Sequence, residues 1–208
     1  MTIQENSRAW AANVQRVRRR GRARRPEVDV RILEAVVAEL CERGVGGITF
    51  DKLALQAGVA KTTIYRRWSN KFDLIIDAID LLRSRSPVPD TGDVRADLVA
   101  GLENMLNAFT SPQGRAIAAV YSECPYNSEL NRAWQEKIAD PHVAAFRSVL
   151  EHGVASGQIL LRAGVDDTIS ILTGFAFFAL WGNLPVGPGL ARDVVATVIE
   201  GIGLPPKS

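Results

Sequence analysis

Residues 49–71, TFDKLALQAGVAKTTIYRRWSNK, constrain the fold of this chain more than any other segment. Two short stretches with apolar residues at helical spacing meet at Gly58, and glycine adopts the left-handed backbone of a tight turn at little cost. The second stretch carries polar and basic side chains from Lys61 to Arg67. Because the DNA major groove admits a single α-helix, this layout predicts a helix-turn-helix whose second helix faces DNA.

The rest of the N-terminal region completes a small helical head. A stripe of apolar residues predicts a first helix over residues 27–43, and Thr49 is a plausible N-cap of the second helix. The recognition helix is expected over residues 60–67. A further helix should begin near an N-cap at Asn70 and end before Pro87.

The remainder of the chain also repeats its apolar residues at helical spacing, without strand alternation or internal repeats. The linker-like segment SPVPDTG, residues 86–92, separates the head from these longer patterns. Pro141 should kink or break one of them. The expected helices cover about 93–109, 113–122, 128–156, 166–184 and 190–201.

These patterns predict an all-α fold with three parts. Residues 1–25 form an Arg-rich arm, residues 26–85 a three-helix DNA-binding head of the helix-turn-helix type, and residues 93–208 a larger helical domain. The arm contains eight arginines and one acid, a net charge of +7, whereas the other 183 residues carry 17 basic and 22 acidic side chains, a net charge of −5. A local basic arm on an acidic body is the electrostatic pattern of a nucleic-acid binder.

Several other classes of protein fit the sequence poorly. Cys41 and Cys124 lack the spacing of a disulfide framework or a zinc site, so we expect a reducing cytoplasm and neither metal nor cofactor. The uncharged apolar stretch 169–184 has 16 residues, fewer than the ~20 that a spanning helix needs. His142 and His152 are the only histidines, and no catalytic motif accompanies them, so we do not expect an enzyme.

At this point the residues match a known family. Residues 31–74 resemble the DNA-binding domain of TetR-type (tetracycline-repressor-like) regulators. The resemblance rests on Gly44 followed by Thr49-Phe50, on the turn at Ala57-Gly58-Val59, and on the K-x-x-I-Y-x-x-W-x-N-K run from Lys61 to Lys71. It implies a transcriptional regulator, most often a repressor, whose homodimer binds a palindromic operator and is released by a small, largely apolar ligand.

The side chains of the helix-turn-helix divide into two groups of expected DNA contacts. Base edges are within reach of Lys61, Thr62 and Arg66, since Arg pairs with guanine and a Thr methyl meets the thymine methyl. The resemblance implies contacts to or near phosphate for Thr63, Tyr65, Arg67 and Thr49. Lys52 and Lys71 are further candidates for phosphate contacts, the latter at a helix N-terminus. Asp51 departs from relatives that carry a basic base-reading residue there.

Each of these assignments has a plainer alternative, because charged residues on a short helix commonly form a solvated face. For Trp68 we favour a place in the core of the head.

The arm is expected to lie along phosphates or in the minor groove, with Arg22, Arg24 and Arg25 nearest the head.

The C-terminal helices carry two further hypotheses. Homodimerisation is expected through the last two helices, about 166–184 and 190–201, because their apolar surface is too large to remain exposed to water. The apolar residues concerned are Ile169, Leu172, Phe175, Ala176, Ala179, Leu180, Val194, Val195, Val198 and Ile199. A ligand pocket lined by aromatic and apolar side chains is expected among Met105, Phe109, Tyr121, Trp134, Phe146, Phe177 and Trp181. Such side chains also build ordinary cores.

Two alternatives remain open at the level of function. One is a non-specific architectural DNA-binding protein, which the basic arm favours and the acidic body disfavours. The other is a regulator without a small ligand, controlled by its abundance alone.

Deleting residues 1–25 tests the arm. If the arginines contact phosphate, the deletion should weaken binding to every DNA sequence and flatten its dependence on salt, because fewer counterions are released. Equilibrium binding across a salt series measures both effects. An unchanged affinity and salt slope would show that the arm only aids solubility.

Overall fold

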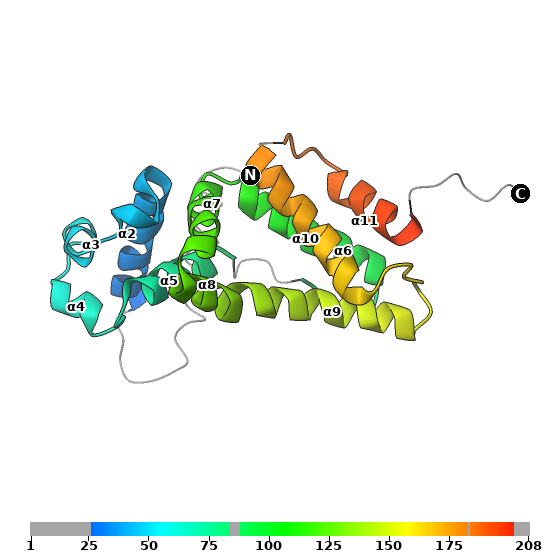
Figure 1. The fold of residues 1–208 in the computed structure, drawn as a ribbon, viewed down its shortest axis with the longest axis horizontal. Coiled ribbons are helices and arrows are strands. Elements are labelled where there is room, and N and C mark those ends of the chain that lie inside the picture. The colour runs from blue at the N-terminus through cyan, green and yellow to red at the C-terminus, as the bar shows by residue number, and fades with distance from the viewer. Residues whose placement is uncertain (1–25, 84–87, 183, 202–208) are drawn as a thin grey trace, which may run out of the picture. The chain divides into compact units, whose positions relative to one another are not determined.

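A computed structural model describes residues 26–83, 88–182 and 184–201. Within these ranges the secondary structure is helical and contains no strand, which confirms the all-α prediction. The chain forms two compact units (Figure 1). The first extends to Arg85 and includes Arg115–Ile138, and the second comprises Ser86–Gly114 and the chain from Ala139 onward. The three-part division of the sequence stays a prediction.

The first unit contains the helix-turn-helix. Helix α2 packs against α3 and α5, and α5 packs against α8. The core residues of α2 are Ile32, Val36 and Leu40, which meet Leu53 of α3 and Ile75 of α5 in a buried set. The helices of this unit are α2 (Pro26–Arg43), α3 (Phe50–Ala57), α4 (Lys61–Tyr65), α5 (Lys71–Arg83), α7 (Gly114–Glu123) and α8 (Ser128–Trp134).

Local cap chemistry sets the ends of α3 and the start of α5. Thr49 caps α3 by accepting a hydrogen bond from the backbone N–H of Lys52 at 3.4 Å. Gly58 ends α3 in the left-handed conformation, with φ 62° and ψ 43°, which glycine adopts without a Cβ clash. Asn70 caps α5 by accepting from the backbone N–H of Asp73 at 2.8 Å. All three expected termini are confirmed.

Helix α4 is shorter than the expected 60–67. It ends at Tyr65, because the backbone N–H of Arg67 turns back to the carbonyl of Ile64 at 2.8 Å, in the tighter geometry common at helix ends. A five-residue helix is not stable alone in water. Ile64, which is completely buried, therefore anchors α4 to the head.

The second unit is built around α6 (Val94–Thr110). This helix packs against α9 (Asp140–Ala155), α10 (Val165–Gly182) and α11 (Leu190–Glu200), as Figure 1 shows. Leu98, Leu102 and Leu106 recur along α6 and are buried, as are Phe146 and Leu150 of α9. These side chains form the core of the second unit.

The predicted break near Pro141 is a change of helix type. A π-helical turn, Gln135–Ala139, follows α8, and Pro141 then lies in the first turn of α9. Proline is tolerated in a first turn, where its missing N–H has no helical partner to lose. The expected helix over 128–156 is therefore two α-helices joined by this turn.

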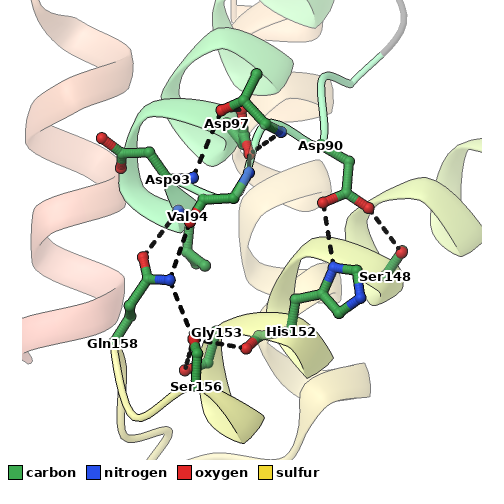
Figure 2. A network of polar contacts seen from close by, with 11 residues as sticks. Asp90, Asp93, Val94, Asp97, Ser148, His152, Gly153, Ser156 and Gln158 are labelled. Carbon is green, nitrogen blue, oxygen red and sulfur yellow. Dashed lines mark hydrogen bonds and ion pairs between the residues drawn. The ribbon is translucent and has the colours of Figure 1, made fainter.

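Figure 2 shows the polar contacts that fix the segment leading into α6. Asp97 is buried and accepts from the backbone N–H of Thr91 at 2.7 Å and from its hydroxyl at 2.8 Å. The amide of Gln158 accepts from the N–H of Val94 at 3.3 Å and donates to the carbonyl of Gly92 at 2.9 Å. The buried carboxylate is thus satisfied by the turn that it holds.

Asp90 ties the same segment to α9. Its carboxylate accepts from the Ser148 hydroxyl at 3.0 Å and lies 3.2 Å from Nδ1 of His152 (Figure 2). The contact with His152 and then the Ser148 hydrogen bond lower the pKa of Asp90. A carboxyl with a depressed pKa stabilises the fold above its unfolded-state pKa of about 3.9 and stops doing so as the pH falls through its folded-state value.

Asp90→Ala should therefore destabilise the second unit at pH 6, and the difference from the unmodified protein should shrink as the pH is lowered toward 3. Chemical denaturation at both pH values measures it. Ser170→Ala of α10 is the control, because it removes one exposed hydrogen bond, to the backbone carbonyl of Asp166, and no contact with a titrating side chain. A difference that stays constant or grows on acidification would contradict this role for Asp90.

Candidate nucleic-acid interface

Helix α4 has one buried side and one polar side. Ile64 points into the core, while Lys61, Thr62, Tyr65 and Arg66 are exposed. A helix of this kind, held by one apolar anchor, presents its other side chains to a partner. The outward placement expected for these four residues is confirmed, and their contacts with DNA remain a prediction.

Tyr65 is supported by α3. Its ring meets the edge of the Phe50 ring at a centroid distance of 4.6 Å, and the side chain is still 53% exposed. The ammonium of Lys61 lies 5.6 Å from the centre of the Tyr65 ring, within range of a cation–π contact. The tyrosine is thus positioned by packing and leaves its outer part free for a partner.

Lys61 is also paired with an acid of the neighbouring helix. Its Nζ atom lies 2.8 Å from Oδ2 of Asp51, in the first turn of α3. This hydrogen bond raises the pKa of Lys61 above its ordinary value, so the ammonium stays charged at neutral pH. The pairing of Asp51 with Lys61 was not predicted from the sequence, because the two residues lie on different helices.

Two of the cations expected to contact phosphate have acidic partners inside the head, and their contacts with DNA remain a prediction. Arg67 forms an ion pair with Asp29 at the start of α2, and both side chains are largely buried. Its guanidinium also donates to the carbonyl of Thr63 at 3.2 Å. Lys52 forms an ion pair with Glu39 of α2. Both cations stabilise the packing of the helix-turn-helix against α2.

Glu39 is the centre of this second set of contacts. It is completely buried, and besides Lys52 it contacts the guanidinium of Arg43 at 3.5 Å and accepts from the amide of Gln56 at 3.3 Å. A buried carboxylate is tolerated only with such partners. The sequence held a signal for it, since Glu39 lies between Val37 and Leu40 on the apolar side of the first helix.

The remaining candidates lie at helix ends. Thr49 is exposed and caps α3. Lys71 is the first residue of α5, half-buried, with its ammonium 5.2 Å from the centre of the Phe72 ring. Thr63 is half-buried on α4. Arg22, Arg24 and Arg25 lie outside the described residues.

Trp68 belongs to the core of the head, as expected. It is buried, and its indole N–H donates to Asp77 of α5 at 2.8 Å. The ammonium of Lys137 donates to the other oxygen of Asp77 at 3.1 Å. The residues that follow α4 are therefore held against α5 by the Trp68–Asp77 hydrogen bond as well as by packing.

The expected pocket residues are divided between the two units. In the first, the rings of Tyr121 and Trp134 lie 5.6 Å apart. In the second, Phe109 and Phe177 lie 5.0 Å apart, and Met105 and Phe146 are buried. Trp181 is 56% exposed, near the end of α10, and its place in a pocket remains a prediction.

The apolar residues of α10 face both inward and outward. Ile169, Leu172, Ala176 and Ala179 are buried within the chain, as is Val195 of α11, so their expected place on a dimer surface is wrong. The exposed apolar side chains of α10 are instead Ile171, Phe178 and Trp181.

Among the described helices, α10 alone is long and apolar enough to cross a membrane, a criterion that the core helices of soluble proteins also meet.

The two parts of the chain match two family models. Residues 32–78 match the model of bacterial regulatory proteins of the tetR family, and residues 88–198 match the tetracyclin repressor-like C-terminal domain. The fold and the exposed face of α4 thus define a helix-turn-helix DNA-binding protein. The chain belongs to the tetR family of transcriptional regulators.

Relatives of similar length support this placement. The HTH-type transcriptional regulator YdeS of Bacillus subtilis is 30% identical over 187 residues, which cover 88% of this chain and 94% of YdeS. The DNA-binding transcriptional repressor TetR of Mycobacteroides abscessus is 27% identical, over 82% of this chain and 89% of that protein.

Solved structures show the same fold. The TetR family transcription regulator SCO0332 has a TM-score of 0.66 and 28% identity, covering 86% of this chain and all of that one. The regulator FadR from Bacillus subtilis, solved in complex with stearoyl-CoA, has a TM-score of 0.66 and 21% identity over 83% of this chain and 98% of its own. At that identity the second likeness concerns the fold alone.

Replacing Glu39 with alanine tests the buried contacts behind α3. The substitution should lower the free energy of unfolding by about 2–3 kcal/mol, because it leaves the partly buried ammonium of Lys52 without its partner. Urea denaturation measures the change. The matched control Glu42→Ala, at an exposed position of α2, should shift stability by less than about 0.5 kcal/mol. Equal effects of the two substitutions would contradict the structural role of Glu39.

Proposed function

We propose that this regulator is a repressor whose homodimer binds a palindromic operator, with α4 of each protomer in the major groove. The observation that carries the proposal is the exposed side of α4. There Lys61, Thr62, Tyr65 and the following residue, Arg66, are exposed, while Ile64 is buried. Major-groove binding by a recognition helix uses such an exposed side, and two copies together supply the contact area that specific binding requires.

The contacts divide by chemistry. Thr62 and Arg66, both exposed, are assigned to base edges, since a guanidinium donates two hydrogen bonds to guanine O6 and N7. Thr63, Tyr65 and Thr49 are assigned to phosphate or its vicinity. Lys71 adds its charge at the N-terminus of α5, where the helix dipole also favours an anion. Phosphate contacts hold the register, and base contacts select the sequence.

The exposed side of α10 is proposed as the dimer surface. Ile171, Phe178 and Trp181 are each at least half exposed, and Phe175 lies between them in sequence. Apolar side chains clustered along one helix are costly in water and gain from burial against a second copy. Helix α11 contributes the half-buried Val194 and Val198. This surface keeps the same two helices and, of the residues expected from the sequence, Phe175, Val194 and Val198. Ile171, Phe178 and Trp181 take the place of the buried residues.

The effector is proposed to be a small, largely apolar molecule. Phe109 and Phe177 of the second unit provide the aromatic surface that such a ligand prefers. Tyr121 and Trp134 form a separate aromatic pair within the first unit. Its effect requires different affinities for the DNA-binding and free conformations. A protein acting on chromosomal DNA in this way would work in the cytoplasm.

Selection of bound DNA from a random pool tests the proposal directly. The selected sequences should share a motif with two-fold symmetry, and the protein should prefer it over random DNA by a factor of about 10³ or more. A protein that coats DNA without sequence preference, the alternative favoured by the basic arm, would select no motif.

Lys71→Ala separates phosphate contacts from base contacts. It should weaken binding to selected and random DNA by the same factor and lower the slope of log K against log salt by about one. The control Arg132→Ala removes an exposed positive charge from α8 and should leave the slope unchanged. A loss confined to the selected motif would contradict the assignment of Lys71.

A further inference from the structure

The contacts assigned so far include Lys61 among the residues that reach base edges, but they give no part to its acidic partner, Asp51. Asp51 and Lys61 come from different helices and meet at 2.8 Å. Their side chains are 75% and 43% exposed, so the pair lies at the surface. Ion pairs as exposed as this one contribute little to stability, typically less than about 1 kcal/mol.

The pair is also out of place for binding phosphate. A carboxylate in the first turn of α3, next to the recognition helix, repels the DNA backbone and neutralises the lysine that would otherwise attract it. An acid on such a surface lowers affinity for DNA in general unless it meets a hydrogen-bond donor. In the major groove the donors are the amino groups of bases, and Asp pairs with N4 of cytosine.

The geometry of the pair matches one base pair. The major-groove edge of G·C presents the O6 and N7 acceptors of guanine beside the N4 donor of cytosine. The ammonium of Lys61 offers three donors, and Oδ2 of Asp51 lies beside it as an acceptor. Donor and acceptor thus lie 2.8 Å apart on the protein, side by side as the O6 acceptor and the N4 donor are on the base pair.

The hydrogen bond to Asp51 and the Tyr65 ring restrain Lys61 before DNA arrives. Asp51 follows Phe50, whose ring supports Tyr65, and the Tyr65 ring lies under the ammonium of Lys61 at 5.6 Å. The pair and the two aromatic rings therefore connect the start of α3 with both ends of α4. A lysine restrained in this way loses less side-chain entropy on binding than a free one.

We propose that Asp51 and Lys61 together read one G·C base pair in each half of the operator, with Lys61 donating to guanine and Asp51 accepting from N4 of the cytosine. This inference rests on the proposed function and makes Asp51 a specificity-determining residue of that interface. It predicts that Asp51 favours the G·C pair at this position and lowers the affinity for DNA that carries another base pair there.

Selection from a random pool with the full-length protein and with Asp51→Ala tests the inference. The unmodified protein should fix one G·C pair in each half-site. Asp51→Ala should still select the motif, while its discrimination against A·T at that pair should fall by about 5- to 100-fold. Lys61→Met should relax the same pair. Dissociation constants on the selected operator and on its A·T replacement quantify the effect.

Glu42→Ala is the matched control, since it removes one negative charge from an exposed position of α2 and should leave every base preference intact. The inference is overturned if Asp51→Ala keeps the preference at every position, raises affinity equally for all sequences, or relaxes a different base pair from Lys61→Met. A protein that selects no motif before any substitution would instead refute the proposed function itself.

Discussion

The burial of Ile64 is the contact on which the DNA-facing surface depends. Helix α4 has only five residues and cannot persist by its own hydrogen bonds. The completely buried Ile64 side chain and the left-handed turn at Gly58 fix its backbone from two directions. Every outward residue of α4 takes its orientation from these two constraints. The chemistry of the exposed side of α4 therefore depends on a buried apolar contact.

Ion pairs behind this surface decide which cations remain for DNA. Arg67 and Lys52 are neutralised by acids of α2, and in return they hold α3 and α4 against that helix. Lys61 is held by an acid on the surface itself, and Arg66 is exposed. The pairing of these cations favours a few positioned contacts over a large positive potential, and such contacts suit sequence readout better than general attraction to phosphate.

Sequence alone predicted those features whose cause is local. Thr49, Gly58 and Asn70 were identified as helix ends because caps and turns depend on residues within a few positions. The roles of Lys52 and Arg67 were missed because their partners, Glu39 and Asp29, lie on another helix. Periodicity also failed on α10, since a helix that is apolar all round does not reveal which side faces its own core.

Chemical protection of guanine N7 on the selected operator tests the central claim most directly. Dimethyl sulfate methylates this atom in the major groove, where we place α4. The account predicts protected guanines in two half-sites related by two-fold symmetry, and loss of that protection when Ile64→Gly removes the anchor of α4. Binding that leaves every guanine N7 of the operator reactive would contradict it.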